Sequence, residues 1–168
     1  MLVLGACDSN RSQGDRQQQS QTNSKESELS DCYDKITHLC QKMEEEGESF
    51  FRHICNIEVR NEEGDLYDLG QYYPTAAFAL THAVNGGSKI TYVLPALKQG
   101  ESIISNLQTI DNTCYDIENE CSAGIEELKD NKKYITSSQK DSWISVLERI
   151  NNYSSEIREQ VQSIRDLQ

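Results

Sequence analysis

Residues 88–130 read SKITYVLPALKQGESIISNLQTIDNTCYDIENECSAGIEELKD, and this stretch decides the fold. Its apolar side chains recur at steps of three and four, the pattern of helices with one buried face. Pro95 and Gly100 interrupt the pattern, so we expect separate or kinked helices over residues 89–99 and 101–130. The buried seam of the longer piece is expected to comprise Ile104, Leu107, Ile110, Cys114, Ile117, Cys121, Ile125 and Leu128.

A second long helix is expected upstream, from Ser27 or Ser30 to about Arg60. Its continuity depends on Gly47, because a glycine inside a helix costs about 1 kcal/mol relative to alanine. We expect the helix to continue through this glycine, and a break there is the alternative. Its buried face is expected to carry Cys32, Ile36, Leu39, Cys40 and Met43.

The remaining segments predict one loop and two further helices. Residues 61–73 predict a loop, because glycine, aspartate and asparagine interrupt every period. Pro74 suits the first turn of a short helix through Val84, which Asn85-Gly86-Gly87 would end. After a turn at residues 131–133, Ser138 and Asp141 are spaced as a capping box for a last helix. Its seam is expected to comprise Trp143, Val146, Leu147, Ile150, Tyr153, Ile157, Val161 and Ile164.

These patterns predict an all-α fold, an elongated antiparallel bundle of three long helices and one short helix over residues 29–168. The 168-residue chain holds 28 acidic and 16 basic residues, a net charge of −12. A surface of that sign repels phosphate backbones and no basic stripe relieves it, so we expect no nucleic-acid partner. A basic protein partner is compatible with this charge, and so is the simpler role of keeping the protein soluble.

Six cysteines are more than a reduced cytosolic protein of this kind usually keeps, which favours export and disulfides. Cys114 and Cys121 lie about 10.5 Å apart along one helix and cannot bridge each other. Cys32 and Cys40 are spaced similarly, so two antiparallel helices would form the bridges Cys32–Cys121 and Cys40–Cys114. Cys55 would remain unpaired, and the competing bridge Cys40–Cys55 requires a break in the first helix. Each cysteine could instead be a small buried hydrophobe.

The chain opens Met1-Leu2-Val3-Leu4-Gly5-Ala6-Cys7 and turns polar at Asp8. Leu4-Gly5-Ala6-Cys7 resembles the lipobox of bacterial lipoproteins, which implies that Cys7 is acylated and anchors the chain to a bilayer. Because only six residues precede Cys7, residues 1–7 would be a truncated signal segment. A frayed apolar end, with Cys7 in a third disulfide, is the alternative. Residues 8–28 hold no aromatic or aliphatic side chain, which predicts a disordered polar tether.

The sequence contains only weak motifs for metal binding, catalysis or cofactor binding. His38 and Cys40, like His53 and Cys55, form a His-x-Cys pair, but residues two apart on a helix do not converge, so we expect no metal site. His82 is expected to be a partly exposed surface residue rather than a catalyst. The sequence has no Gly-x-Ser-x-Gly elbow, phosphate loop or His-Glu-x-x-His pattern, so we expect neither an enzyme nor a cofactor.

Recognition of a protein is the remaining function. Tyr67, Tyr72 and Tyr73, with Tyr92, are the expected contact surface, because tyrosine combines contact area with a hydroxyl. Capping of the bundle end by these rings is the alternative. We therefore expect a lipid-anchored protein of the bacterial envelope, facing the periplasm or the exterior, that binds a host or envelope protein. The alternative function is an immunity or inhibitor protein that neutralises a basic toxin or a lysozyme-like enzyme.

Overall fold

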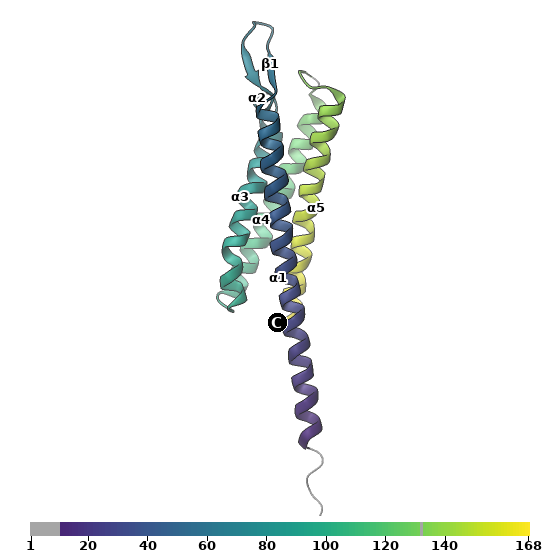
Figure 1. Cartoon of the computed structure of the whole chain (residues 1–168). Helices are drawn as coiled ribbons and strands as arrows, with labels where there is room; N and C mark the ends of the chain where they lie inside the picture. Colours follow the sequence, from purple (N-terminus) through teal and green to yellow (C-terminus); the bar gives the residue numbers. More distant parts are fainter. Residues whose placement is uncertain (1–10, 132) are drawn as a thin grey trace, which may run out of the picture.

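The structure is a computed structural model that describes residues 11–131 and 133–168, with side chains from residue 23 onward (Figure 1). Its elements are α1 (Arg11–Cys55), β1 (Glu58–Arg60), β2 (Leu66–Asp68), α2 (Leu69–Tyr72), α3 (Pro74–Lys98), α4 (Ile103–Asp130) and α5 (Ser137–Leu167). The fold is mostly helical, which confirms the all-α prediction, and a small hairpin is added at one end.

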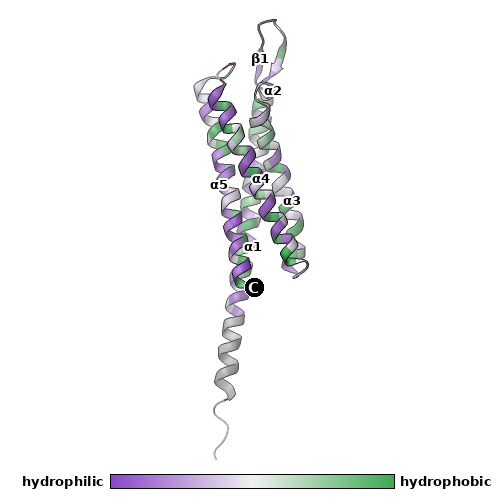
Figure 2. Ribbon diagram, turned by 180° about the vertical axis from the view of Figure 1, so that it is seen from behind, coloured by the Kyte–Doolittle hydropathy of each residue, from purple (hydrophilic) through white to green (hydrophobic). Residues whose placement is uncertain are grey.

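The four long helices of the described residues form an up-and-down bundle (Figure 1). Both α1 and α4 pack against α3 and α5. Helices α1 and α4 therefore lie across a diagonal of the bundle, and two chain reversals make them parallel. Apolar and polar residues alternate along each of the four, as expected for amphipathic helices (Figure 2).

The prediction of a short helix ending at Val84 is wrong, because α3 continues to Lys98. Gly86 and Gly87 do not stop the helix but are buried at contacts with its neighbours. A Cβ on Gly86 would lie 2.5 Å from Ile117 Cδ1 of α4, and one on Gly87 would lie 3.2 Å from the carbonyl oxygen of Cys40 in α1. The two glycines thus allow α3 to approach both neighbours closely.

Near Gly100, where we expected a break or a kink, the chain reverses between α3 and α4, and this residue has a φ of 77°. Pro95 does not break the helix and lies inside its last turn. The last helix, α5, is capped by Thr136 and Gln139 rather than by Ser138 and Asp141. Its predicted seam is buried, with Tyr153 partly exposed.

Helix α1 continues through Gly47, as expected, but ends at Cys55 because the chain then enters the hairpin. It begins at Arg11, so the structure shows helix in most of residues 8–28, where we expected a disordered tether. Residues 23–28 are exposed, and Lys25 Nζ lies 3.5 Å from the carbonyl oxygen of Leu167 at the end of α5. The part of α1 that precedes them projects beyond the bundle (Figure 1). Extending an existing helix costs less than nucleating one, so the packed part of α1 supports the projection. Cys7 and the rest of residues 1–10 lie outside the described residues.

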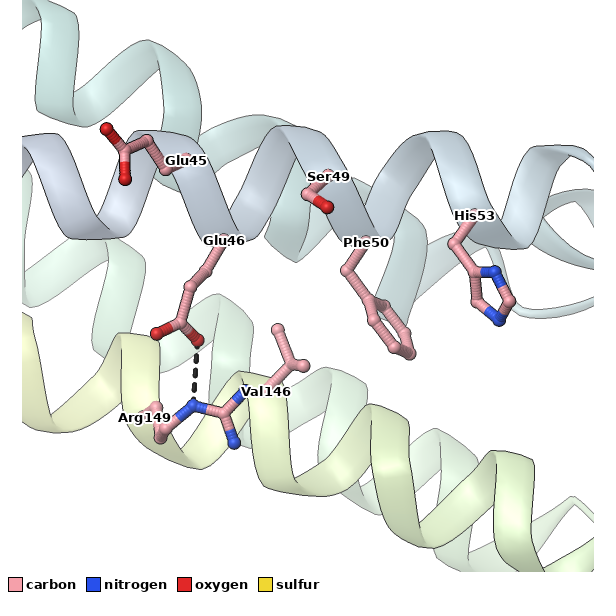
Figure 3. A pocket seen from close by; sticks show the side chains of 7 residues that line it. All are labelled: Glu45, Glu46, Ser49, Phe50, His53, Val146 and Arg149. Atoms are coloured by element: carbon pink, nitrogen blue, oxygen red, sulfur yellow. Dashed lines mark hydrogen bonds and ion pairs between the residues drawn. The ribbon is translucent and has the colours of Figure 1, made fainter.

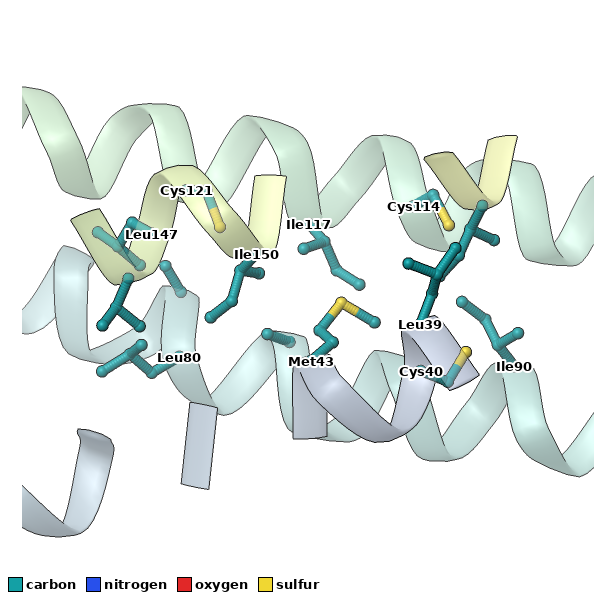
Figure 4. Close-up of a cluster of buried hydrophobic side chains, with 14 of the residues drawn as sticks. Leu39, Cys40, Met43, Leu80, Ile90, Cys114, Ile117, Cys121, Leu147 and Ile150 are labelled. Atoms are coloured by element: carbon teal, nitrogen blue, oxygen red, sulfur yellow. The ribbon is translucent and has the colours of Figure 1, made fainter. Parts of the chain in front are cut away.

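The core runs along the centre of the bundle and includes the α4 seam from Leu107 to Leu128, with Ile125 partly exposed. One predicted seam residue is wrong: Ile104 is 86% exposed. It lies in the first turn of α4, where the neighbouring Ile103 packs against the core instead. Side chains of all four long helices meet in the middle of the bundle (Figure 4).

The predicted bridges Cys32–Cys121 and Cys40–Cys114 are wrong, because the five cysteines of the described residues are free thiols. The prediction required antiparallel helices, whereas α1 and α4 are parallel and diagonal. Axes of packed helices already lie about 8–10 Å apart, and a disulfide needs Cα atoms about 4.4–6.8 Å apart. Cys40 and Cys114 share one level of the core without bonding, and Cys121 lies further along α4 (Figure 4).

These cysteines act as small buried hydrophobes, apart from the partly exposed Cys55. Burial raises the pKa of the Cys40 thiol to about 12, although a hydrogen bond with Thr91 opposes the shift. Burial also raises the pKa of Cys121 to about 12. Burial raises the pKa of Cys114 as well, and nearby Cys40 adds to the effect. The buried thiols are therefore protonated and unreactive at neutral pH.

Candidate functional site

One end of the bundle, which we call the hairpin pole, carries the hairpin, α2 and the described residues of the α4–α5 connection, 131 and 133–136 (Figure 1). Residues 61–73 are not a plain loop, because β1 and β2 pair antiparallel, with Val59 opposite Tyr67 and Arg60 opposite Leu66. Asn61 Oδ1 accepts hydrogen bonds from the backbone nitrogens of Glu63 at 3.0 Å and Asp65 at 2.8 Å. The hairpin tip is therefore an ordered turn.

The hairpin exposes both apolar and acidic side chains. Leu66 and Tyr67 of β2 are 49% and 38% exposed. Glu62, Glu63 and Asp65 are exposed around the tip. The only basic side chain of the hairpin, Arg60, donates a hydrogen bond to the carbonyl oxygen of Gly64. The tip therefore presents negative charge beside an apolar strand.

Tyr67 and Tyr72 belong to a small aromatic cluster at the hairpin pole. Their ring centroids lie 5.5 Å apart in an edge-on arrangement. The ring of Tyr134, from the α4–α5 connection, lies 4.3 Å from that of Tyr72. Sequence reasoning missed Tyr134, because nothing local relates it to residues some 60 positions earlier. Tyr67 is the member that faces solvent most, and Tyr72 is partly buried between the other two rings.

The other two tyrosines of the predicted contact surface, Tyr73 and Tyr92, are not part of this aromatic cluster. Tyr73 is fully buried, and its hydroxyl donates a hydrogen bond to the carbonyl oxygen of Lys133 at 2.6 Å. Burial raises the pKa of Tyr73, and the charge of Glu127 adds to the shift. Tyr92 is 85% exposed but lies 18 residues along α3 from Pro74, about 27 Å from the hairpin pole. The structure thus brings Tyr67 and Tyr72 together, makes Tyr73 structural and separates Tyr92.

A groove lies between α1 and α5 next to the hairpin pole. We call it the α1–α5 groove, and Phe50 lines each of its three cavities, of about 510, 220 and 730 Å³. Arg149 Nε lies 2.8 Å from Glu46 Oε2 across its inner end (Figure 3). The other oxygen of Glu46 accepts a hydrogen bond from the Tyr153 hydroxyl at 2.6 Å.

The floor of the α1–α5 groove is apolar. The ring of Phe50 is partly exposed, while Val146 and Trp143 are buried beside it. The centroids of Phe50 and Trp143 lie 6.0 Å apart, and Trp143 is 5.7 Å from Tyr73. Trp143 Nε1 is buried and has no hydrogen-bond partner among the described residues. This aromatic row connects the groove to the interior of the hairpin pole.

Two features of the sequence open the groove. On the opposite side of α1, a Cβ on Gly47 would lie 3.1 Å from the carbonyl oxygen of Leu80, so α1 sits close against α3 there. On the groove side, four lining residues are serines, whose side chains are too short to close the gap. They are Ser49, Ser138, Ser142 and Ser145.

The described residues hold no group of three His, Cys, Asp or Glu side chains that could bind a metal ion. His82 packs against Phe78, with ring centroids 5.6 Å apart, and is partly exposed, as expected. In the same part of the chain, no helix is both long enough and apolar enough to cross a membrane.

Searches of protein families, of curated proteins and of solved structures found no match to this chain.

Proposed function

We propose that this protein is an exported lipoprotein of the bacterial envelope, anchored through Cys7, that binds a protein partner with its hairpin pole. The observation that carries the proposal is the position of the two ends of α1. Arg11 lies at the far end of the projecting helix, and Cys55 leads into the hairpin (Figure 1). At 1.5 Å per residue, the 45 residues of α1 separate these ends by about 65 Å.

An anchor close to Arg11 would therefore hold the hairpin pole away from the bilayer. Leu66 and Tyr67 would then be exposed at the end away from the bilayer, where an apolar and an aromatic side chain support contact with another protein. The support for export comes from Leu4-Gly5-Ala6-Cys7 alone, because the free thiols in the bundle add none.

The anchor is tested by cell fractionation. The intact protein should remain with the membranes, and mass spectrometry should find acyl chains on Cys7. A Cys7→Ser variant should move to the soluble fraction, because acyl chains supply the attachment. The anchor would be refuted if the Cys7→Ser variant also remained with the membranes, or if Cys7 were unmodified in the native protein. Neither result would bear on the proposed binding surface.

The binding surface is tested by site-specific photo-crosslinking in cells. A photoreactive phenylalanine analogue replaces Tyr67, with Tyr115 as the matched control, because Tyr115 is a 54% exposed tyrosine in the middle of α4. We expect a discrete crosslinked product from position 67 and none from position 115. Equal products from both positions, or none from position 67, would contradict the hairpin pole as the contact surface.

A second candidate function, inhibition of a basic toxin or lysozyme-like enzyme, is favoured by the acidic tip. Glu62, Glu63 and Asp65 form a negative projection on an ordered turn. Binding to an immobilised basic lysozyme should then weaken with salt and with the variant Glu62→Lys/Glu63→Lys. Salt-insensitive binding, or the same affinity in the variant, would exclude this function.

A further inference from the structure

The α1–α5 groove has free carboxylates on both rims. Glu45 on α1 and Asp141 on α5 are exposed, and neither forms an ion pair within the described residues. The one arginine in the groove, Arg149, is already paired with Glu46 (Figure 3). An occupant therefore meets an apolar floor between two unneutralised negative charges, on a protein with a net charge of −12.

The length of the groove restricts its occupant. Its α5 side runs from Ser138 to Arg149, about 16 Å at 1.5 Å per residue. An extended chain covers that distance in about five residues, and its side chains alternate between the two faces. The apolar residues of such a segment would point to Phe50 and Val146, while its charged residues would point to the rims.

We infer that the α1–α5 groove binds a short extended segment of a protein partner in which basic and apolar residues alternate. Lysine or arginine side chains pair with Glu45 and Asp141, and the apolar side chains cover Phe50. The groove is separate from the exposed strand and tip of the hairpin. Its test therefore does not depend on the function proposed for that surface.

Trp143 makes the inference directly testable, because it is the single tryptophan of the chain and lines the groove. The probe is a blocked synthetic peptide of sequence KLKLK, titrated into the full-length protein at low salt while tryptophan emission is recorded. We expect a saturable change in emission. The peptide ELELE, of equal length and apolar content, should cause none.

Two double variants with the same change in charge separate a specific site from general attraction to an acidic protein. Glu45→Gln/Asp141→Asn removes both rim charges, and Glu62→Gln/Glu63→Gln removes two charges from the hairpin tip. Since all four side chains are exposed, both variants should fold. The rim variant should weaken KLKLK binding about threefold to tenfold, as expected for two exposed ion pairs, and the tip variant should leave it unchanged.

Three results would overturn the inference. They are the absence of a saturable change with KLKLK, equal binding of ELELE, and equal weakening by the rim and tip variants.

Discussion

The middle of the bundle and the hairpin pole differ in how closely their side chains are packed and how far they are exposed. In the middle, the helices pack so closely that glycines occupy their contact positions. The cysteine thiols there are buried and protonated at neutral pH. At the hairpin pole, Leu66 and Tyr67 remain exposed on a strand of only three residues, beside acidic side chains. The middle is built of buried side chains, whereas the pole leaves apolar and acidic side chains at the surface.

The roles of the cysteines and tyrosines depend on their place in the fold and not on residue type alone. Two seam cysteines looked like the braces of the bundle, yet they serve as ordinary core residues. Four tyrosines looked like one contact surface, yet Tyr73 is buried and Tyr92 lies far along α3. Substitutions can test whether the middle of the bundle contributes more to stability than the exposed side chains of the hairpin pole.

The largest effect is expected from Ile117→Ala in the middle of α4. Ile117 is fully buried against Gly86, so the variant should lose about 2 to 5 kcal/mol of unfolding free energy. The matched control is Ile104→Ala in the same helix, which should change stability by less than about 0.5 kcal/mol because Ile104 is 86% exposed. Urea denaturation followed by circular dichroism measures both. Equal losses would show that the α4 seam is misplaced.

A smaller loss of unfolding free energy is expected from Gly124→Ala. Although alanine favours a helix, its Cβ would lie 2.8 Å from Ala76 Cα, a backbone atom that cannot move aside alone. Overpacking should therefore cost about 1 to 3 kcal/mol. Ser122→Ala, at an exposed position two residues earlier, should change stability little. A stabilised Gly124→Ala variant would mean that α3 and α4 are not in close contact.

Alkaline pH should destabilise the middle of the bundle. A thiol whose pKa is near 9 when unfolded and about 12 when folded stabilises the protein fully below pH 9. That contribution falls as the pH rises toward 12, by on the order of 1 kcal/mol per thiol at pH 10. The melting temperature should decline between pH 9 and 11, and less steeply in Cys121→Ala. An identical slope in both proteins would contradict the burial of this thiol.

The smallest effect is expected at the hairpin pole. Lys133 Nζ lies 3.9 Å from Glu62 Oε1, and both side chains are largely exposed. Lys133→Ala should therefore change the unfolding free energy by less than about 0.5 kcal/mol, within the range of exposed ion pairs. A loss above 1 kcal/mol in urea denaturation would show that the hairpin contributes to the stability of the bundle.

Much of the fold follows from the sequence, because helix periodicity is a local property. The seams of α4 and α5 and the interruption of the helix at Gly100 were predicted from spacing and glycine chemistry. The length of α3 was not predicted, because Gly86 and Gly87 resemble the end of a helix unless the neighbouring helices are known. Of the candidate surface, Tyr67 and Tyr72 were predicted, whereas Tyr134 and the α1–α5 groove depend on contacts between distant segments.

Composition and apolar spacing are properties of the sequence, and they fix the acidic charge and the buried faces of these amphipathic helices. Which helices are neighbours depends on how the chain folds in space, and no local pattern shows it. With α3 as a full-length helix, α1 and α4 become parallel and diagonal, so their cysteines stay apart and no disulfide forms between them. Whether two helices are parallel or antiparallel depends on the number of chain reversals between them. Gly86 and Gly87 resemble a helix end in the sequence, so the number of reversals could not be counted correctly from the sequence.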